Sequence, residues 1–373
     1  MLKRVESGER MLDSPVSAQS VINTSVPDIS YKSDSKYDVI KFLLSLMVLA
    51  IHSALYPMIL YPWLRIAVPI FFVISSKFIF AKLFHASQQT QAEILKKYVL
   101  RNLRLYACWF VILLPITLYI RKEQYFSAGF FENVLVILKS ILFGSTFVAS
   151  WFIMASIIGV LIIYFLTKIA HKDYLVLLFA LFAFCIVTLT SSYSSIITDT
   201  FVSSAINGYI NIVGDLICSF PAAIIWVFIG KLFAERKIVI KSVGVWIFLM
   251  ICSCIALFAE WKFVISLDGS YNNDSYFMLV PVCFLLFLGV ESIKPICWEK
   301  SVHLRRASTI IYVIHGSLLQ IVSKLTSILF DVKIPVLSFI LTLTGCIAIY
   351  ALIEIALNKC RNRHVCIFLK MLF

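Results

Sequence analysis

The sequence predicts an all-α, polytopic membrane protein of about ten transmembrane helices with both termini in the cytoplasm. Hydrophobic residues make up 61% of the 373 residues and charged residues 14%, and the mean hydropathy is +0.95, which excludes an ordinary soluble domain. Apolar runs of spanning length alternate with short polar or basic breaks. Lysine and arginine are concentrated in alternate breaks, as the positive-inside rule requires.

Three regions follow from this pattern. Residues 1–36 are polar and lack helical periodicity, so we expect a disordered cytoplasmic leader. Residues 37–357 form the membrane domain, and residues 358–373 form a basic cytoplasmic tail. The ten predicted spans are 38–56, 63–83, 105–120, 147–169, 174–190, 214–233, 243–261, 275–293, 307–325 and 334–357.

Most of the 33 lysine and arginine residues lie before the first span, in the loops after every second span and in the tail. This side is therefore predicted to be cytoplasmic. The net charge of +13 is explained by attraction to anionic headgroups at the inner surface, so nucleic-acid binding is not needed to account for it. The ten cysteines are scattered without a CxxC pair, which favours buried thiols over disulfides or a zinc site, and no metal is expected.

The first span carries two ionisable residues, Lys41 and His52, eleven positions apart. Eleven residues at about 100° each bring a helix back to within about 20° of its starting direction, so both side chains share one face. The rise between them is about 16 Å. Ionisable residues in hydrocarbon are costly, which favours a functional role, although His52 could also join two helices by a hydrogen bond.

Residues 91–106 predict an amphipathic helix at the inner surface that then turns into the third span. Arg101 and Arg104 are three residues apart on it, so both guanidinium groups can reach one anionic group. Anchoring to the inner leaflet would explain the two charges equally well. Residues 132–143 are apolar but too short to span, and we expect them in the outer interface.

These motifs resemble those of the acyltransferase-3 family, integral-membrane enzymes that include bacterial O-antigen and other polysaccharide O-acetyltransferases. Family members have a basic residue, ten intervening residues and a histidine in the first span, as in Lys41 and His52, and an Arg-x-x-Arg motif at the third span, as in Arg101 and Arg104. Lysine replaces the more usual arginine at position 41, and Ser76 replaces a usual glycine. Three further segments are similar to family motifs: VPIFFVISSKF (68–78), SWFIMASIIG (150–159) and IIYVIHGSLL (310–319).

The resemblance implies a membrane O-acyltransferase, most simply an O-acetyltransferase, of the bacterial inner membrane. Its donor would be cytoplasmic acyl-CoA such as acetyl-CoA, and its acceptor a hydroxyl of a lipid-linked or surface glycan such as the O-antigen of lipopolysaccharide. Membrane lipids are the other expected partners, and nucleic acid is not.

The resemblance and the residue chemistry together suggest roles. Lys41, Arg101 and Arg104 would bind the donor's phosphates, and the pantetheine arm would run along the first span to His52, acting as general base or as acyl-carrying nucleophile. Residues that could line the cavity or contact the acceptor are Arg65, Ser75, Trp151, Tyr312 and His315. For these residues structural roles stay open: snorkelling for Arg65, an interfacial belt position for Trp151, and packing for Tyr312 and His315.

A transporter or exporter of a glycan or small solute, without covalent chemistry, is the alternative. Lys41, Arg65 and Lys77 inside the spans would serve a permeation path as well as they would serve catalysis. A membrane polymerase or ligase for polysaccharide is a third possibility. Neither alternative specifically requires the first-span histidine motif together with the Arg-x-x-Arg pair, and acyl transfer by purified protein would separate the classes.

Overall fold

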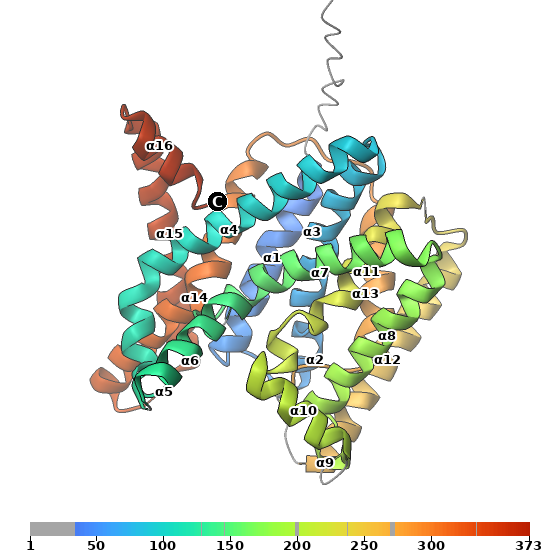
Figure 1. Cartoon of the computed structure of the whole chain (residues 1–373), viewed down its shortest axis with the longest axis horizontal. Coiled ribbons are helices and arrows are strands. Elements are labelled where there is room, and N and C mark those ends of the chain that lie inside the picture. The colour runs from blue at the N-terminus through green and yellow to red at the C-terminus, as the bar shows by residue number, and fades with distance from the viewer. Residues whose placement is uncertain are drawn as a thin grey trace, which may run out of the picture. The chain divides into compact units, whose positions relative to one another are not determined.

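The computed structural model describes residues 34–127, 129–144, 146–197, 201–236, 238–268, 273–332 and 334–373, which contain helices and no β-strand. The predicted leader falls outside these residues up to position 33. The longer helices are α1 (Ser35–His52), α3 (Ala67–Phe84), α4 (Gln88–Ile120), α7 (Ser150–Ala170), α8 (Asp173–Ser191), α11 (Pro221–Glu235), α12 (Val243–Asp268), α13 (Leu279–Ser292), α14 (Ser301–Phe330) and α15 (Pro335–Lys359) (Figure 1).

Shorter helices connect or flank these: η1 (Met58–Leu60), α2 (Tyr61–Leu64), α5 (Lys122–Phe126), α6 (Phe130–Phe143), α9 (Ser194–Ile197), α10 (Phe201–Ile212), η2 (Leu216–Cys218) and α16 (Arg363–Lys370). The segment expected in the outer interface falls in α6, whose 14 residues would cover about 21 Å, less than the hydrocarbon core. Its two leading phenylalanines, Phe130 and Phe131, are 77% and 81% exposed, as suits a helix that faces lipid.

Each of the ten predicted spans overlaps a helix, and the all-α, polytopic fold class is confirmed. Seven of the described helices are long and apolar enough to cross a membrane, and the bent pair Ser204–Cys218 and Pro221–Glu235 would make eight. Helix α13 is apolar but shorter. Helix α1 is not among the seven because its 18 residues include three charged ones, Lys36, Asp38 and Lys41, in the first two turns.

The third predicted span differs from expectation. We expected a surface helix over 91–106 that turns into the membrane, whereas α4 is one helix of 33 residues. No glycine or proline interrupts residues 88–114, and the single interior proline is Pro115. At about 1.5 Å per residue α4 is about 50 Å long, longer than the hydrocarbon core of about 30 Å.

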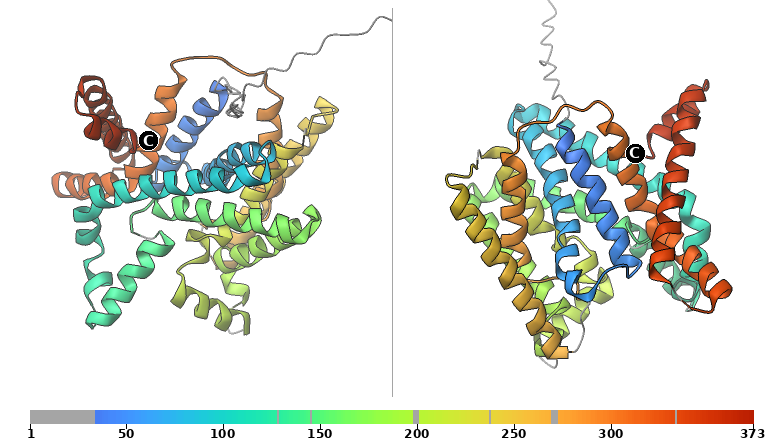
Figure 2. Two further views of the ribbon diagram at one scale, coloured as in Figure 1. Left: turned by 45° about the horizontal axis from the view of Figure 1, so that its top comes forward. Right: turned by 180° about the vertical axis from the view of Figure 1, so that it is seen from behind.

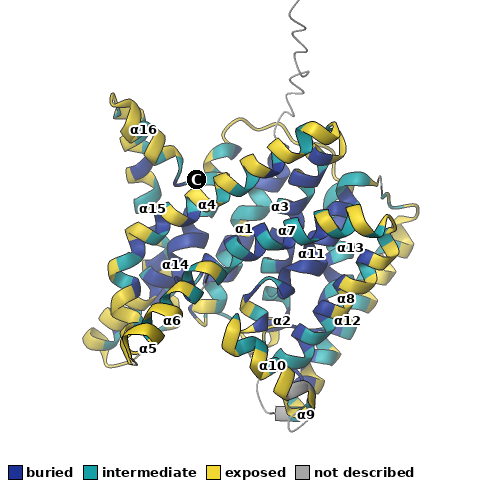
Figure 3. Ribbon diagram, in the orientation of Figure 1, coloured by how far each residue is buried: buried dark blue, intermediate teal, exposed yellow. Residues whose placement is uncertain are grey.

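The helices lie in two groups. Seen from behind, six of them form a row in the order α12, α13, α3, α1, α14, α15 (Figure 2). Helices α4, α7, α8 and α11 lie on the other side, and α11 packs against α3, α7 and α8. Burial is greatest along α3 and α11, whereas α12 and α15 expose most of their apolar surface, as expected for lipid-facing helices (Figure 3).

Helices α3 and α11 make the most extensive contact, and they approach closely at Gly230. A Cβ atom there would lie 2.6 Å from the Val73 carbonyl oxygen and 2.0 Å from Ser76 Oγ. The Ser76 hydroxyl donates a hydrogen bond back to the Phe72 carbonyl at 2.6 Å. Serine is therefore accommodated at position 76, where glycine is more usual, because the facing residue of α11 is a glycine.

Both ends of the described chain lie at the same end of the helices. Near the start of α1, Asp38 accepts a 2.8 Å hydrogen bond from Ser301 Oγ at the start of α14. The C-terminal Phe373 ring lies 5.4 Å from the Arg306 guanidinium, also near the start of α14. We term this the basic end, and the opposite end, where α1 and α14 finish, the pocket end.

Candidate active site

His52 is the last residue of α1. The helix stops there because Ala54 adopts a left-handed φ of 55° and the Leu55 N–H bonds back to the Ala50 carbonyl at 3.0 Å. The His52 side chain is exposed, because it faces a pocket rather than a packed helix.

The long contact between α1 and α14 brings a second histidine against His52. The ring centroids of His52 and His315 are 5.0 Å apart. His315 is 1% exposed, and its Nδ1 lies 2.7 Å from the Tyr312 carbonyl oxygen. Since a carbonyl oxygen can only accept, Nδ1 carries the hydrogen, which assigns the lone pair of the neutral ring to Nε2. Among the described residues this buried Nε2 has no hydrogen-bond partner.

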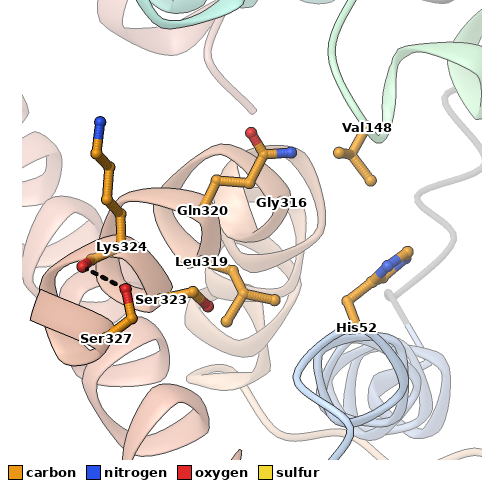
Figure 4. A pocket seen from close by; sticks show the side chains of 8 residues that line it. All are labelled: His52, Val148, Gly316, Leu319, Gln320, Ser323, Lys324 and Ser327. Carbon is orange, nitrogen blue, oxygen red and sulfur yellow. Dashed lines mark hydrogen bonds between the residues drawn. The ribbon is translucent and has the colours of Figure 1, made fainter. Parts of the chain in front are cut away.

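A pocket of about 490 Å³ adjoins His52, and we term it the His52 pocket (Figure 4). It is lined by His52, Val148, Gly316, Leu319, Gln320, Ser323, Lys324 and Ser327. Most of these come from the second half of α14, so the pocket lies toward the pocket end. A Cβ atom on Gly316 would lie 2.4 Å from Val148 Cβ, so the absence of a side chain allows Val148 to approach α14.

Cations gather toward the basic end. Lys41 Nζ lies over the Phe78 ring at 5.6 Å and within electrostatic reach of Arg101 on α4 and Arg305 on α14. Arg101 and Arg104 are both exposed, and neither forms an ion pair within the part of the chain that the structure describes. The structure thus brings Lys41 and Arg101 together, as the donor-site prediction needs, and adds Arg305. Nothing in the sequence around Arg305 indicated this, because its position depends on the packing of α14 against α1.

Arg65 is not a lone snorkelling cation. It forms an ion pair with Asp274, and its guanidinium lies 4.5 Å from the centre of the Tyr61 ring. It is within electrostatic reach of His52 but does not line the His52 pocket. Ser75 is half-buried and does not line the pocket either.

Trp151 and Tyr312 belong to a cluster of aromatic side chains. The Tyr312 ring lies 5.1 Å from both Phe71 and Phe152, and the Trp151 ring lies 6.0 Å from Phe72. Neither Trp151 nor Tyr312 is among the residues that line the His52 pocket. Of the five candidate cavity residues, His315 alone lies against the His52 ring. The Tyr312 backbone carbonyl accepts the hydrogen bond from His315 Nδ1.

Lys77 is paired inside the protein. Its ammonium forms an ion pair with Glu291 and donates to the Tyr37 hydroxyl at 2.6 Å. By sequence alone, Lys77 is one of the charges inside the spans that could line a permeation path. Because Glu291 already balances its charge, Lys77 gives that interpretation little support.

No sequence motif singled out the polar residues of α14 that line the pocket. Gln320, Ser323 and Ser327 fall inside the ninth predicted span or just beyond it, at spacings of three and four. That spacing is the signal that could have identified them, because it places polar groups on one helix face. No group of three or more metal-binding side chains that could hold an ion occurs among the described residues.

The fold and the site define a multi-pass membrane protein with a cationic cluster near one end, a polar pocket toward the other and two histidines in contact beside that pocket. Residues 34–352 match the family model described as the acyltransferase domain of acyltransferase 3, and this match covers most of the chain. The chain belongs to the acyltransferase-3 family and is a membrane acyltransferase. No curated protein and no solved structure matches it.

Proposed function

We propose that this acyltransferase moves an acyl group, most simply acetyl, from cytoplasmic acyl-CoA to a hydroxyl of a cell-surface glycan such as O-antigen, in the bacterial inner membrane. The observation that carries the proposal is the position of His52. It ends a helix whose start lies beside the cationic cluster, and its ring faces a pocket that lies toward the opposite end.

The donor binds from the basic end. The two exposed guanidinium groups of Arg101 and Arg104 and the neighbouring Lys41 suit the phosphates of coenzyme A, because charge-assisted hydrogen bonds to phosphate are strong. From Lys41 to His52 the helix rises about 16 Å, a distance that the long, thin pantetheine arm can cover.

His52 acts as the general base. It takes the proton of the acceptor hydroxyl while the hydroxyl oxygen attacks the thioester carbonyl carbon. A carbon–oxygen bond forms, the carbon–sulfur bond breaks, and coenzyme A leaves as a thiolate that recovers the proton. The products are an ester of the glycan and free coenzyme A. The contacting ring of His315 holds His52 in position.

The test is acyl transfer by purified protein. His52→Ala should lower the rate by about 10²- to 10⁴-fold, the usual contribution of a general base, while acyl-CoA binding is retained. The matched control is His85→Ala, since His85 is an exposed histidine just after α3. A well-folded His52→Ala protein that transfers at the normal rate would refute the mechanism. An acyl group trapped on His52 after incubation with donor alone would instead make His52 the nucleophile.

A further inference from the structure

The lining of the His52 pocket points to the chemistry of its ligand. We propose that this pocket is the acceptor site and that it selects a saccharide bearing an anionic group, a carboxylate or a phosphate, near the hydroxyl that is acylated. The proposal rests on the proposed function and extends it to substrate class. Its two parts are a hydrogen-bonding stripe on α14 and the charge of Lys324.

The stripe is formed by one face of α14. Gly316, Gln320, Ser323 and Ser327 follow each other at steps of four, three and four residues, which keeps them within about 60° of arc. The opposite face is apolar and exposed, as shown by Ile321, Leu325 and Ile328 at 40%, 54% and 70%. One face of α14 is therefore apolar and faces lipid, whereas the opposite face is polar and lines the pocket.

These polar groups are available to a ligand. The Gln320 amide and the Ser323 hydroxyl form no side-chain hydrogen bond with any other described residue. Ser327 Oγ donates to the Lys324 carbonyl at 2.9 Å and keeps its own lone pairs free to accept. An amide and two hydroxyls on one surface match a ligand rich in hydroxyl groups, because each can both donate and accept.

Lys324 supplies the charge. Its ammonium donates to the Tyr119 hydroxyl and lies 4.8 Å from the centre of that ring, but it forms no ion pair with any described carboxylate. A hydroxyl group does not neutralise a cation. None of the residues that line the pocket is acidic, and the other ionisable one is His52. The pocket is therefore electropositive, which favours an anionic ligand and disfavours a cationic one.

Figure 4 shows the geometry that this site would use. Gln320 and Lys324 project from α14 on the side of the helix that also faces Val148, and the His52 ring points toward Val148 from α1. A sugar hydroxyl held by Gln320 would therefore lie near the base. An acidic group of the same sugar or its neighbour would lie toward Lys324.

Binding of defined saccharides to purified protein in detergent tests the charge preference. Trigalacturonate carries carboxylates that galactotriose lacks, and galactose 6-phosphate carries a phosphate that galactose lacks. We expect the anionic member of at least one pair to bind about tenfold or more tightly than its neutral partner, and the pair that responds identifies the anion. Lys324→Gln should abolish this difference, whereas Lys122→Gln, which removes an exposed cation from the neighbouring α5, should preserve it.

A second variant tests the stripe. Gln320→Leu should weaken neutral and anionic saccharides alike by about fivefold to tenfold, because it removes hydrogen bonds that do not depend on charge. Leu325→Ala, on the lipid-facing side of α14, should have no such effect. The proposal is overturned if anionic and neutral sugars bind equally to the unaltered protein, or if the preference survives in Lys324→Gln.

Failure of the acceptor proposal can be distinguished from failure of the proposed function. Donor binding and His52-dependent transfer to glycan in membranes are measured without the model saccharides. If His52→Ala keeps normal transfer, the proposed function fails. If His52 is essential but Lys324→Gln retains the preference, the acceptor proposal alone fails.

Discussion

The contact between two imidazole rings distinguishes His52 from an isolated polar residue in a span. His315 is held by its Nδ1 hydrogen bond to the Tyr312 carbonyl, so its ring orientation is fixed by the backbone of α14. Its Nε2 is buried, and among the described residues it has no hydrogen-bond partner, although the His52 ring lies beside it. A buried unpaired nitrogen costs free energy, and such a cost is commonly retained at functional positions.

His315→Asn separates packing from positioning. The asparagine amide nitrogen can replace Nδ1 as donor to the Tyr312 carbonyl, whereas the group corresponding to Nε2 is lost. We expect normal folding and donor binding but a fall in kcat of about 10- to 100-fold, with an altered pH–rate profile. If kcat and the pH–rate profile are unchanged, His315 serves packing alone.

The donor site makes a second residue-scale prediction. Replacing Arg101 and Arg104 together with alanine should weaken acyl-CoA binding substantially, since each charge-assisted hydrogen bond to phosphate contributes about 1.5 to 3 kcal/mol. Acyl-CoA affinity of the purified protein measures this. Arg361→Ala with Arg363→Ala removes the same charge from the exposed tail and should leave affinity unchanged. If both double variants bind acyl-CoA with equal affinity, Arg101 and Arg104 serve membrane anchoring and do not bind the donor.

At this scale the sequence singles out the residues of the proposed donor site more readily than those that line the pocket. Lys41, His52, Arg101 and Arg104 stood out because charges in or beside a span are costly and their spacings are regular. Gln320 and Ser323 carry no charge, so they did not stand out from the polar residues that join helices by hydrogen bonds. The proximity of His315 to His52 depends on how α1 packs on α14, which no local pattern encodes.

At the scale of helices, the close contact between α3 and α11 allows a direct test of packing. Gly230→Ala would place a methyl group 2.6 Å from a backbone carbonyl of α3, which cannot move as a flexible side chain can. We expect a loss of stability of about 1 to 3 kcal/mol, the usual cost of overpacking. Gly208→Ala, where a Cβ would meet nothing within 4 Å, is the matched control.

Thermal unfolding of the two variants in the same detergent gives the measurement. Gly230→Ala should melt at a lower temperature, and Gly208→Ala should melt close to the unaltered protein. Equal melting temperatures would mean that α3 and α11 can separate without cost, contrary to the close contact described above.

The helices themselves were predictable because hydrophobic runs of spanning length leave few alternatives. The boundary between the surface helix and the third span was not, since no glycine, proline or cap marks residues near 105 and helix continues through them. The break after His52 was also hidden, because Ser53 and Ala54 carry no strong stop signal, although Pro57 follows shortly.

For the whole molecule, the cation distribution predicts both termini in the cytoplasm and the loops near Tyr193 and Asn272 outside. Asn272 falls outside the described residues, so Tyr193 is the position to use. A reporter active only outside the cytoplasm should be active when fused after Tyr193 and inactive at the C-terminus. Activity at the C-terminus would mean that the chain crosses an odd number of times.

The placement of His52 between the basic end and the His52 pocket has a consequence for reversibility. On the proposed function, coenzyme A is released where it is made and the ester is released across the bilayer, so the two products never share a compartment. Reversal would need coenzyme A from one side and the ester from the other to be bound at once, so a higher cytoplasmic ratio of acyl-CoA to coenzyme A shifts net flux toward ester formation. In sealed vesicles of one orientation, coenzyme A should inhibit from one face of the membrane and the acylated saccharide from the other.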